Sequence, residues 1–250
     1  MPRYKLTLEY DGTPYCGWQK QTEAPSVQAV LEAALGEFMN VGAPIDTQCA
    51  GRTDSGVHAR GQVVHVDLAE ERVPHNIILG LNALMVPHPV AVVSAELVSD
   101  DFSARFGAKK RHYIYRIVNR PGRLALDESR AWHVHKPLDL AAMNAAAQLL
   151  IGTHDFTTFR AGECQSTSPV KTLDTLEVIA RKNNPEQVMV RTNARSFLHH
   201  QVRNMVGTLQ YVGIGKWSME QVAEALAAKD RRAGGPMAPS HGLYLMKVDY

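Results

Sequence analysis

The stretch from Gly51 to Ala59 holds the residues with the clearest capacity for chemistry. Its order is Gly-Arg-Thr-Asp-Ser-Gly-Val-His-Ala, so the carboxylate of Asp54 follows the cation of Arg52 and precedes a hydroxyl. The glycines Gly51 and Gly56 allow backbone angles that other residues resist. We interpret the stretch as a loop that holds Asp54 in a fixed pose beside Arg52, as a nucleophile or a general base.

Two other interpretations of Asp54 stay open on local sequence alone. An aspartate beside threonine, serine and glycine is typical of a turn in which the carboxylate bonds its own loop backbone. A metal site would recruit His58 with His65 or His75, but the spacing of these histidines matches no common ligand pattern.

A second segment combines cations with aromatic residues. Lys109, Lys110 and Arg111 precede an expected strand in which Tyr113 and Tyr115 share one face, because they are two residues apart. Cations bind phosphate and an aromatic face stacks on an unpaired base, so the segment suits single-stranded or flipped-out nucleotides. A solvated basic edge strand with two core tyrosines explains the same residues equally well.

A third segment, from Arg195 to Asn204, carries two arginines and two histidines without an acidic residue. We expect it to begin a helix over about 198–212. In such a helix His199 and Arg203, four residues apart, share a face that is less buried than the apolar one. The functional interpretation places Arg203 against a buried carboxylate or a phosphate, and the alternative is a solvated surface helix.

Composition narrows the class of protein. The chain has 250 residues, of which 45% are hydrophobic and 21% charged, as in ordinary globular proteins. A net charge of +2 predicts no broad basic surface, so any polyanion site must come from local clusters. The three cysteines lack C-x-x-C pairing, which favours reduced thiols in a cytoplasmic protein. We expect neither a membrane span nor a signal peptide.

Hydrophobic periodicity predicts the elements that position these segments. In the first half we expect strands at 3–10, 62–68 and 90–97, and helices at about 26–38 and 77–84. In the second half we expect strands at 113–118, 173–180, 187–192 and 244–250, and helices at 139–150 and 198–212. A capping box formed by Ser218 and Gln221 predicts the start of one more helix.

No helix lies regularly between successive strands, so we expect an α+β fold with largely antiparallel sheets. Each half mixes a few strands with two helices, which predicts two lobes with helices on one face of each sheet. The polar segment near Phe102–Lys110 is the expected boundary. We divide the chain into a lobe at 1–105, which carries Asp54, and a lobe at 106–250, which carries Tyr113 and Arg203.

Taken together, the segments resemble the TruA-type family of tRNA pseudouridine synthases. The matching motifs span nearly the whole chain in the same order: Glu9–Gly12, Tyr15–Gln19, Ser26–Gln28, Gly51–Ala59, Gly61–His65, Phe102–Phe106, His154–Phe156, Phe197–Asn204 and Gly242–Leu245. That family usually has alanine where Ser55 stands here, a small change that should leave the chemistry undisturbed.

The resemblance implies an activity. It implies isomerisation of uridine to pseudouridine at positions 38, 39 and 40 of the tRNA anticodon stem-loop, without cofactor or metal. It also implies a cytoplasmic homodimer with the pseudouridine synthase fold, in which a positively charged cleft separates the lobes.

The resemblance also assigns roles to residues. It implies that Asp54 is the catalytic carboxylate, that Tyr113 packs on the target base and assists removal of the C5 proton, and that Arg203 pairs with the carboxylate. Arg52 would lie near the flipped-out nucleotide. We add a set of further substrate-binding candidates: Lys109, Lys110, Arg111 and His199. An RNA-binding module without catalysis, and a hydrolase using Asp54 and His58, are the rival hypotheses.

Overall fold

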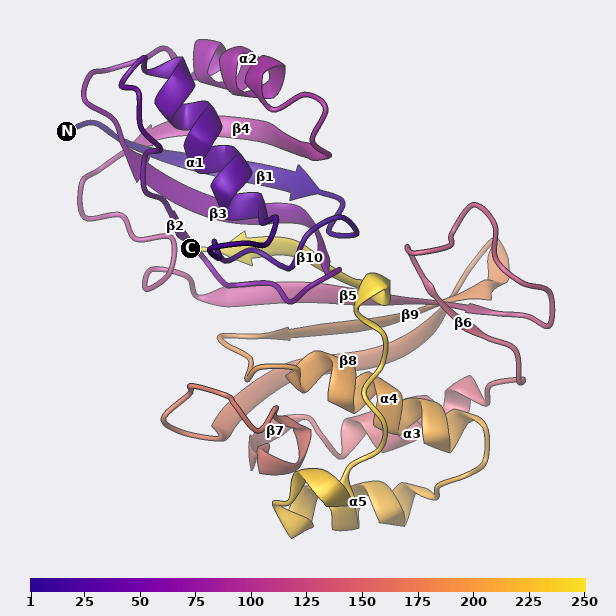
Figure 1. Cartoon of the computed structure of the whole chain (residues 1–250). Coiled ribbons are helices and arrows are strands. Elements are labelled where there is room, and N and C mark those ends of the chain that lie inside the picture. The colour runs from indigo at the N-terminus through magenta and orange to yellow at the C-terminus, as the bar shows by residue number, and fades with distance from the viewer. The chain divides into compact units, whose positions relative to one another are not determined.

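The computed structural model describes residues 1–250 and contains the strands β1 to β10 and the helices α1 to α5 (Figure 1). The chain divides into two compact units. The first comprises residues 1–109 and 244–250, and the second comprises residues 110–243. No helix is both long and apolar enough to cross a membrane.

The first unit is a sheet covered by two helices. Its strands follow the order β4 (Val90–Val98), β1 (Arg3–Tyr10), β3 (His58–Asp67) and β10 (Leu243–Asp249), and the short β2 (Gln48–Cys49) also pairs with β3. All these pairings are antiparallel except that of β10 with β3. The helices α1 (Val27–Phe38) and α2 (Pro74–Leu84) lie side by side on one face (Figure 1).

Alternation along β1 explains which face of this sheet carries the core. Tyr4, Leu6 and Leu8 are fully buried, whereas the residues between them are partly exposed. Because side chains of a strand point to opposite faces in turn, this pattern directs one apolar face toward the helices. Helix α1 begins where the hydroxyl of Ser26 accepts a hydrogen bond from the Ala29 N–H.

The strands of the second unit are mainly antiparallel. Its strands follow the order β5 (Lys110–Asn119), β9 (Asn184–Ala194), β8 (Val170–Arg181) and β7 (Gly152–Asp155), and β6 (Trp132–Val134) pairs in parallel with β5. The helices are α3 (Leu140–Gln148), α4 (Gln201–Gly213) and α5 (Met219–Ala228), with 3₁₀ turns at Thr157–Phe159, Arg231–Ala233 and Ser240–Gly242. Helix α3 packs against β8 and α4.

Helix α4 is buried around its whole circumference, since every residue from Gln201 to Gln210 is buried. Two of its buried polar side chains donate hydrogen bonds to backbone carbonyls. The Asn204 amide donates to the Phe159 carbonyl at 2.8 Å, and the Thr208 hydroxyl donates to the Asn204 carbonyl at 2.8 Å. Gly207 permits another segment to approach, because a Cβ there would lie 1.8 Å from the Pro236 carbonyl oxygen.

The α+β class with mainly antiparallel sheets and helices is confirmed in each unit. The capping box of Ser218 and Gln221 is also present at the start of α5. The expected division placed the last strand in the second lobe. In the structure this strand, β10, pairs with β3 and belongs to the first unit from Tyr244 onward. Alternation identifies a strand, but it carries no information about the neighbour with which a terminal strand pairs.

Replacing Gly207 by alanine should destabilise the second unit. We expect the free energy of unfolding to fall by about 2–3 kcal/mol, because the new methyl group meets backbone that cannot rotate away. Urea unfolding followed by circular dichroism measures this change. The control is Gly122→Ala, where a Cβ meets nothing within 4 Å, and we expect a change below about 0.5 kcal/mol. Equal stabilities of the two variants would contradict the packing described here.

Candidate active site

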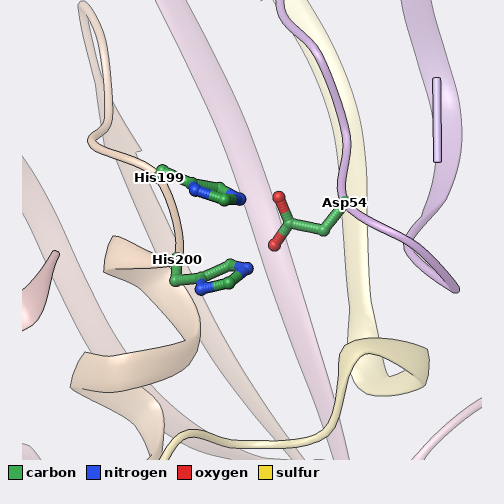
Figure 2. Close-up of side chains that lie close together, drawn as sticks. All are labelled: Asp54, His199 and His200. Atoms are coloured by element: carbon green, nitrogen blue, oxygen red, sulfur yellow. The ribbon is translucent and has the colours of Figure 1, made fainter. Parts of the chain in front are cut away.

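Asp54 lies on the loop between β2 and β3, with its side chain half-buried (Figure 2). The Val57 N–H donates to the Asp54 carbonyl at 3.1 Å and closes a turn. Gly56 has φ of 74°, in the left-handed region that favours glycine, as the sequence predicted. The same expectation for Gly51 is wrong, since Gly51 is not among the glycines with positive φ.

The residues on either side of Asp54 are fixed by the N-terminal segment of the same unit. The Tyr10 hydroxyl lies 2.8 Å from the Thr53 hydroxyl, in a buried hydrogen bond. The Trp18 N–H donates to the Thr53 carbonyl at 3.0 Å, and the Gly56 N–H donates to the Tyr15 carbonyl at 3.3 Å. Bonds on both flanks hold the backbone of Asp54 in one conformation.

Gln62 of β3 adds a further hydrogen bond to the loop. Its side chain is fully buried, and its amide donates to the Gly51 carbonyl at 2.7 Å and to the Tyr10 hydroxyl at 3.5 Å. Sequence reasoning missed both Tyr10 and Gln62 as support for the loop. The available signal was a single amide within the otherwise apolar run that follows Gly61.

The nearby histidines have structural partners. The Nδ1 atom of buried His58 accepts a hydrogen bond from the Gly12 N–H at 3.0 Å, and its ring stacks on Tyr244 with centroids 4.6 Å apart. The Nδ1 atom of His65 accepts from the Ala104 N–H at 3.2 Å, and burial lowers the pKa of His65. These contacts favour a structural role for both residues over the metal and hydrolase interpretations.

Tyr113 and Tyr115 share one face of β5 but differ in environment. Tyr115 is fully buried, its hydroxyl donates to the Pro239 carbonyl at 2.7 Å, and burial raises its pKa. Tyr113 is only half-buried, and its ring meets Phe197 edge-on with centroids 5.3 Å apart. The interpretation as two core tyrosines therefore holds for Tyr115 alone, and Tyr113 keeps part of its ring accessible.

Arg203 is buried, with 8% of its surface exposed. Its Nε donates to the Ala238 carbonyl at 2.9 Å, and the Ala238 N–H donates back to the Arg203 carbonyl at 3.1 Å. The prediction that Arg203 lies on a less buried face of its helix is therefore wrong. The surface-helix alternative fails for the same reason, because α4 is buried on all sides.

His199 and His200 precede α4 (Figure 2). The helix begins at Gln201, because His200 has φ of 64° and breaks the helical backbone. The prediction that His199 and Arg203 share one face of the helix is therefore wrong, because His199 lies before the helix. Instead the rings of His199 and His200 lie against each other, with centroids 3.8 Å apart.

The basic residues before Tyr113 differ in their contacts. Lys110 forms a salt bridge with Asp174 at 2.8 Å, and the Arg111 guanidinium donates to the Arg195 carbonyl. Lys109 is exposed. With Asp54 and the exposed Arg52, Lys109 belongs to the first unit, whereas the other predicted site residues belong to the second: Lys110, Arg111, Tyr113, His199 and Arg203.

Removing the Tyr10 hydroxyl should loosen the Asp54 loop. In Tyr10→Phe the buried Thr53 hydroxyl loses its partner, and we expect the free energy of unfolding to fall by about 1–2 kcal/mol. Urea unfolding measures the loss, and Thr53→Ser, which keeps a hydroxyl at this position, should lie closer to the wild type. A Tyr10→Phe variant as stable as the wild type would show that this hydrogen bond contributes nothing.

Comparison with known proteins matches this chain to one family. The family model described as tRNA pseudouridine synthase matches residues 7–107 and 146–250, which include the Asp54 loop and Arg203. The tRNA pseudouridine synthase A of Azorhizobium caulinodans is 58% identical over 250 residues, covering 100% of this chain and 95% of that protein. The protein of the same name from Rhodopseudomonas palustris is 57% identical, covering 100% of both chains.

A third relative, the tRNA pseudouridine synthase A of Nitrobacter winogradskyi, is 56% identical and covers 100% of this chain and 96% of its own length. The relatives match this chain along its full length, whereas the family model leaves residues 108–145, which include Tyr113, unmatched. The chain belongs to the tRNA pseudouridine synthase family.

Proposed function

We propose that this chain isomerises uridine to pseudouridine in tRNA, and that its targets are positions 38, 39 and 40 of the anticodon stem-loop. The observation that carries the proposal is the hydrogen bonding around Asp54. In the family motif, the residues on both sides of this half-buried carboxylate are held by hydrogen bonds. Family membership supplies the substrate class. The resemblance also supports a cytoplasmic homodimer as the working form.

The reaction exchanges one glycosidic bond for another. The N1–C1′ bond of uridine breaks, the uracil turns, C5 bonds to C1′, and the proton on C5 leaves to solvent. A uridine in a stem must first leave the base stack, at a cost of a few kcal/mol. We assign Asp54 as the carboxylate that acts on the flipped-out nucleotide.

Tyr113 and Arg203 complete the proposed catalytic set. The accessible part of the Tyr113 ring would stack on the target uracil, and its hydroxyl would assist removal of the C5 proton. Arg203 would keep the carboxylate ionised, because a guanidinium stays charged when buried and can form two parallel hydrogen bonds. The bond from Nε to the Ala238 carbonyl fixes the orientation of the guanidinium group.

The remaining basic residues would bind the RNA. Arg52, exposed two residues before Asp54, would contact the flipped-out nucleotide. Lys109 is exposed and suits a phosphate, as does Lys110 if RNA competes with Asp174 for its ammonium group. Arg111 and His199 are the other proposed substrate contacts.

The variant Asp54→Asn tests the proposed role of the Asp54 carboxylate, because it keeps the size of the side chain and removes its charge. We expect this variant to unfold at the same urea concentration and to bind tRNA, but to release tritium from tRNA labelled at uracil C5 at least about a hundred-fold more slowly. A wild-type chain that binds tRNA without any release would favour the RNA-binding module. Normal release by Asp54→Asn would remove Asp54 from the mechanism.

Two substitutions separate the roles of Tyr113. Tyr113→Phe keeps the stacking ring, so we expect wild-type tRNA affinity with turnover reduced roughly a hundred-fold or more. Tyr113→Leu loses the ring as well, so both affinity and turnover should fall. The measurements are the Kd for tRNA and single-turnover tritium release. Full activity of Tyr113→Phe would show that the hydroxyl takes no part in proton transfer.

A further inference from the structure

Phe106 is an exposed aromatic residue in the first unit that the proposed site does not use. Phe106 is 76% exposed and is the only phenylalanine among the exposed large apolar residues. The guanidinium carbon of the exposed Arg105 lies 5.4 Å from the centroid of its ring. An aromatic ring beside a guanidinium within about 6 Å is a cation–π pair, and both groups offer flat surfaces.

The segment that carries this pair is anchored to the unit rather than loosely attached. Ala104 is fully buried, its N–H donates to His65 Nδ1 at 3.2 Å, and its carbonyl accepts from the Tyr250 hydroxyl at 2.8 Å. Beyond it, the Phe106 N–H donates to the Ser103 hydroxyl at 3.2 Å. Because hydrogen bonds fix this turn, binding a ligand on the Phe106 ring would cost little conformational entropy of the backbone.

The same segment lies beside the strand that leads into the Asp54 loop. Ala104 packs with Ala50 in one buried cluster, and Ala50 stands two residues before Arg52. The pKa of a nearby thiol indicates the same proximity of the two segments. Burial raises the pKa of the Cys49 thiol to about 11, and the positive charges of Arg52 and Arg105 both oppose that rise. Arg52 and Arg105 therefore lie within electrostatic reach of one thiol.

The start of the segment carries two carboxylates that lie near Arg3. The hydrogen bond to Asp67, and then the charges of Asp67, Asp100 and Asp101, raise the pKa of Arg3. Arg3 also donates to the Asp100 and Phe102 carbonyls, which ties the start of the segment to Arg3. Arg52, Arg105 and Lys109 are exposed cations of the unit that carries Phe106, and Arg105 is the one that lies beside its ring.

We propose that Arg105 and Phe106 form a second nucleotide-binding platform, on which an unpaired base of the RNA substrate stacks while Arg105 contacts its phosphate. Aromatic rings interleaved with cations bind single-stranded nucleic acid in this way, whereas an anchor for another protein needs no adjacent cation. The inference rests on the proposed function, because it takes RNA as the substrate, and it deepens that function by adding a contact outside the catalytic loop.

The test measures the Kd of the full-length chain for an unmodified tRNA transcript by fluorescence anisotropy. Phe106→Leu keeps an apolar side chain and loses the ring, so we expect affinity to fall roughly ten-fold. Phe106→Trp should bind within about two-fold of the wild type, since it retains a stacking surface. Leu79→Ala, which truncates another exposed apolar side chain of the same unit, is the matched control and should bind as the wild type does.

Arg105→Gln tests the cation separately. We expect weaker binding, with the slope of log Kd against log salt reduced by about one, because one phosphate contact is lost. Sedimentation of every variant accompanies the binding assay. A Phe106→Leu chain that changes its oligomeric state while each folded protomer binds tRNA normally would identify the platform as a contact between copies and overturn the proposal.

Tritium release by the wild-type chain separates the two proposals. If the wild type is active and Phe106→Leu binds tRNA with unchanged Kd, the platform is wrong and the proposed function stands. If the wild type binds tRNA and shows the Phe106 dependence without releasing tritium, the proposed function fails while the platform stands. A wild type that does not bind the transcript overturns both.

Discussion

A buried hydroxyl pair connects the first strand to the loop that carries Asp54, and the geometry of the loop depends on it. Tyr10 ends β1, more than forty residues before Thr53, yet their hydroxyls lie 2.8 Å apart. Gln62 joins the same network through the Gly51 carbonyl. The side chains of Tyr10, Thr53 and Gln62 are buried, so losing the Tyr10 hydroxyl would leave the Thr53 hydroxyl buried without this hydrogen bond. Together these side chains hold the loop that carries the Asp54 carboxylate.

The second unit also holds a candidate site residue through hydrogen bonds with the backbone. Arg203 is held by an exchange of hydrogen bonds with Ala238, and Gly207 allows the segment at Pro236 to approach α4 closely enough for that exchange. A charged side chain inside a buried helix is expensive unless a partner compensates it. That cost is itself an argument for function, since a helix built for stability alone would carry an apolar residue here.

Local features could be predicted from the sequence, and long-range ones could not. The alternation of β1, the cap at Ser26 and the capping box at Ser218 were predicted because they depend on residues a few positions apart. The start of α4 was not, because nothing in the sequence marks His200 as left-handed. Neither the partner of β10 nor the Tyr10–Thr53 bond was predicted, since each joins segments distant in the chain. The candidate site residues were identified from sequence motifs. The structure added the hydrogen bonds and the packing that hold these residues in place.

We propose that this chain makes pseudouridine in tRNA through Asp54. The most direct test maps pseudouridine at every position of tRNA from cells that contain the protein, from cells that lack it, and from cells that express only the Asp54→Asn form. We predict that pseudouridine at positions 38, 39 and 40 disappears without the protein and does not return with Asp54→Asn. Pseudouridine that persists at these positions without the protein, or that Asp54→Asn restores, would contradict it.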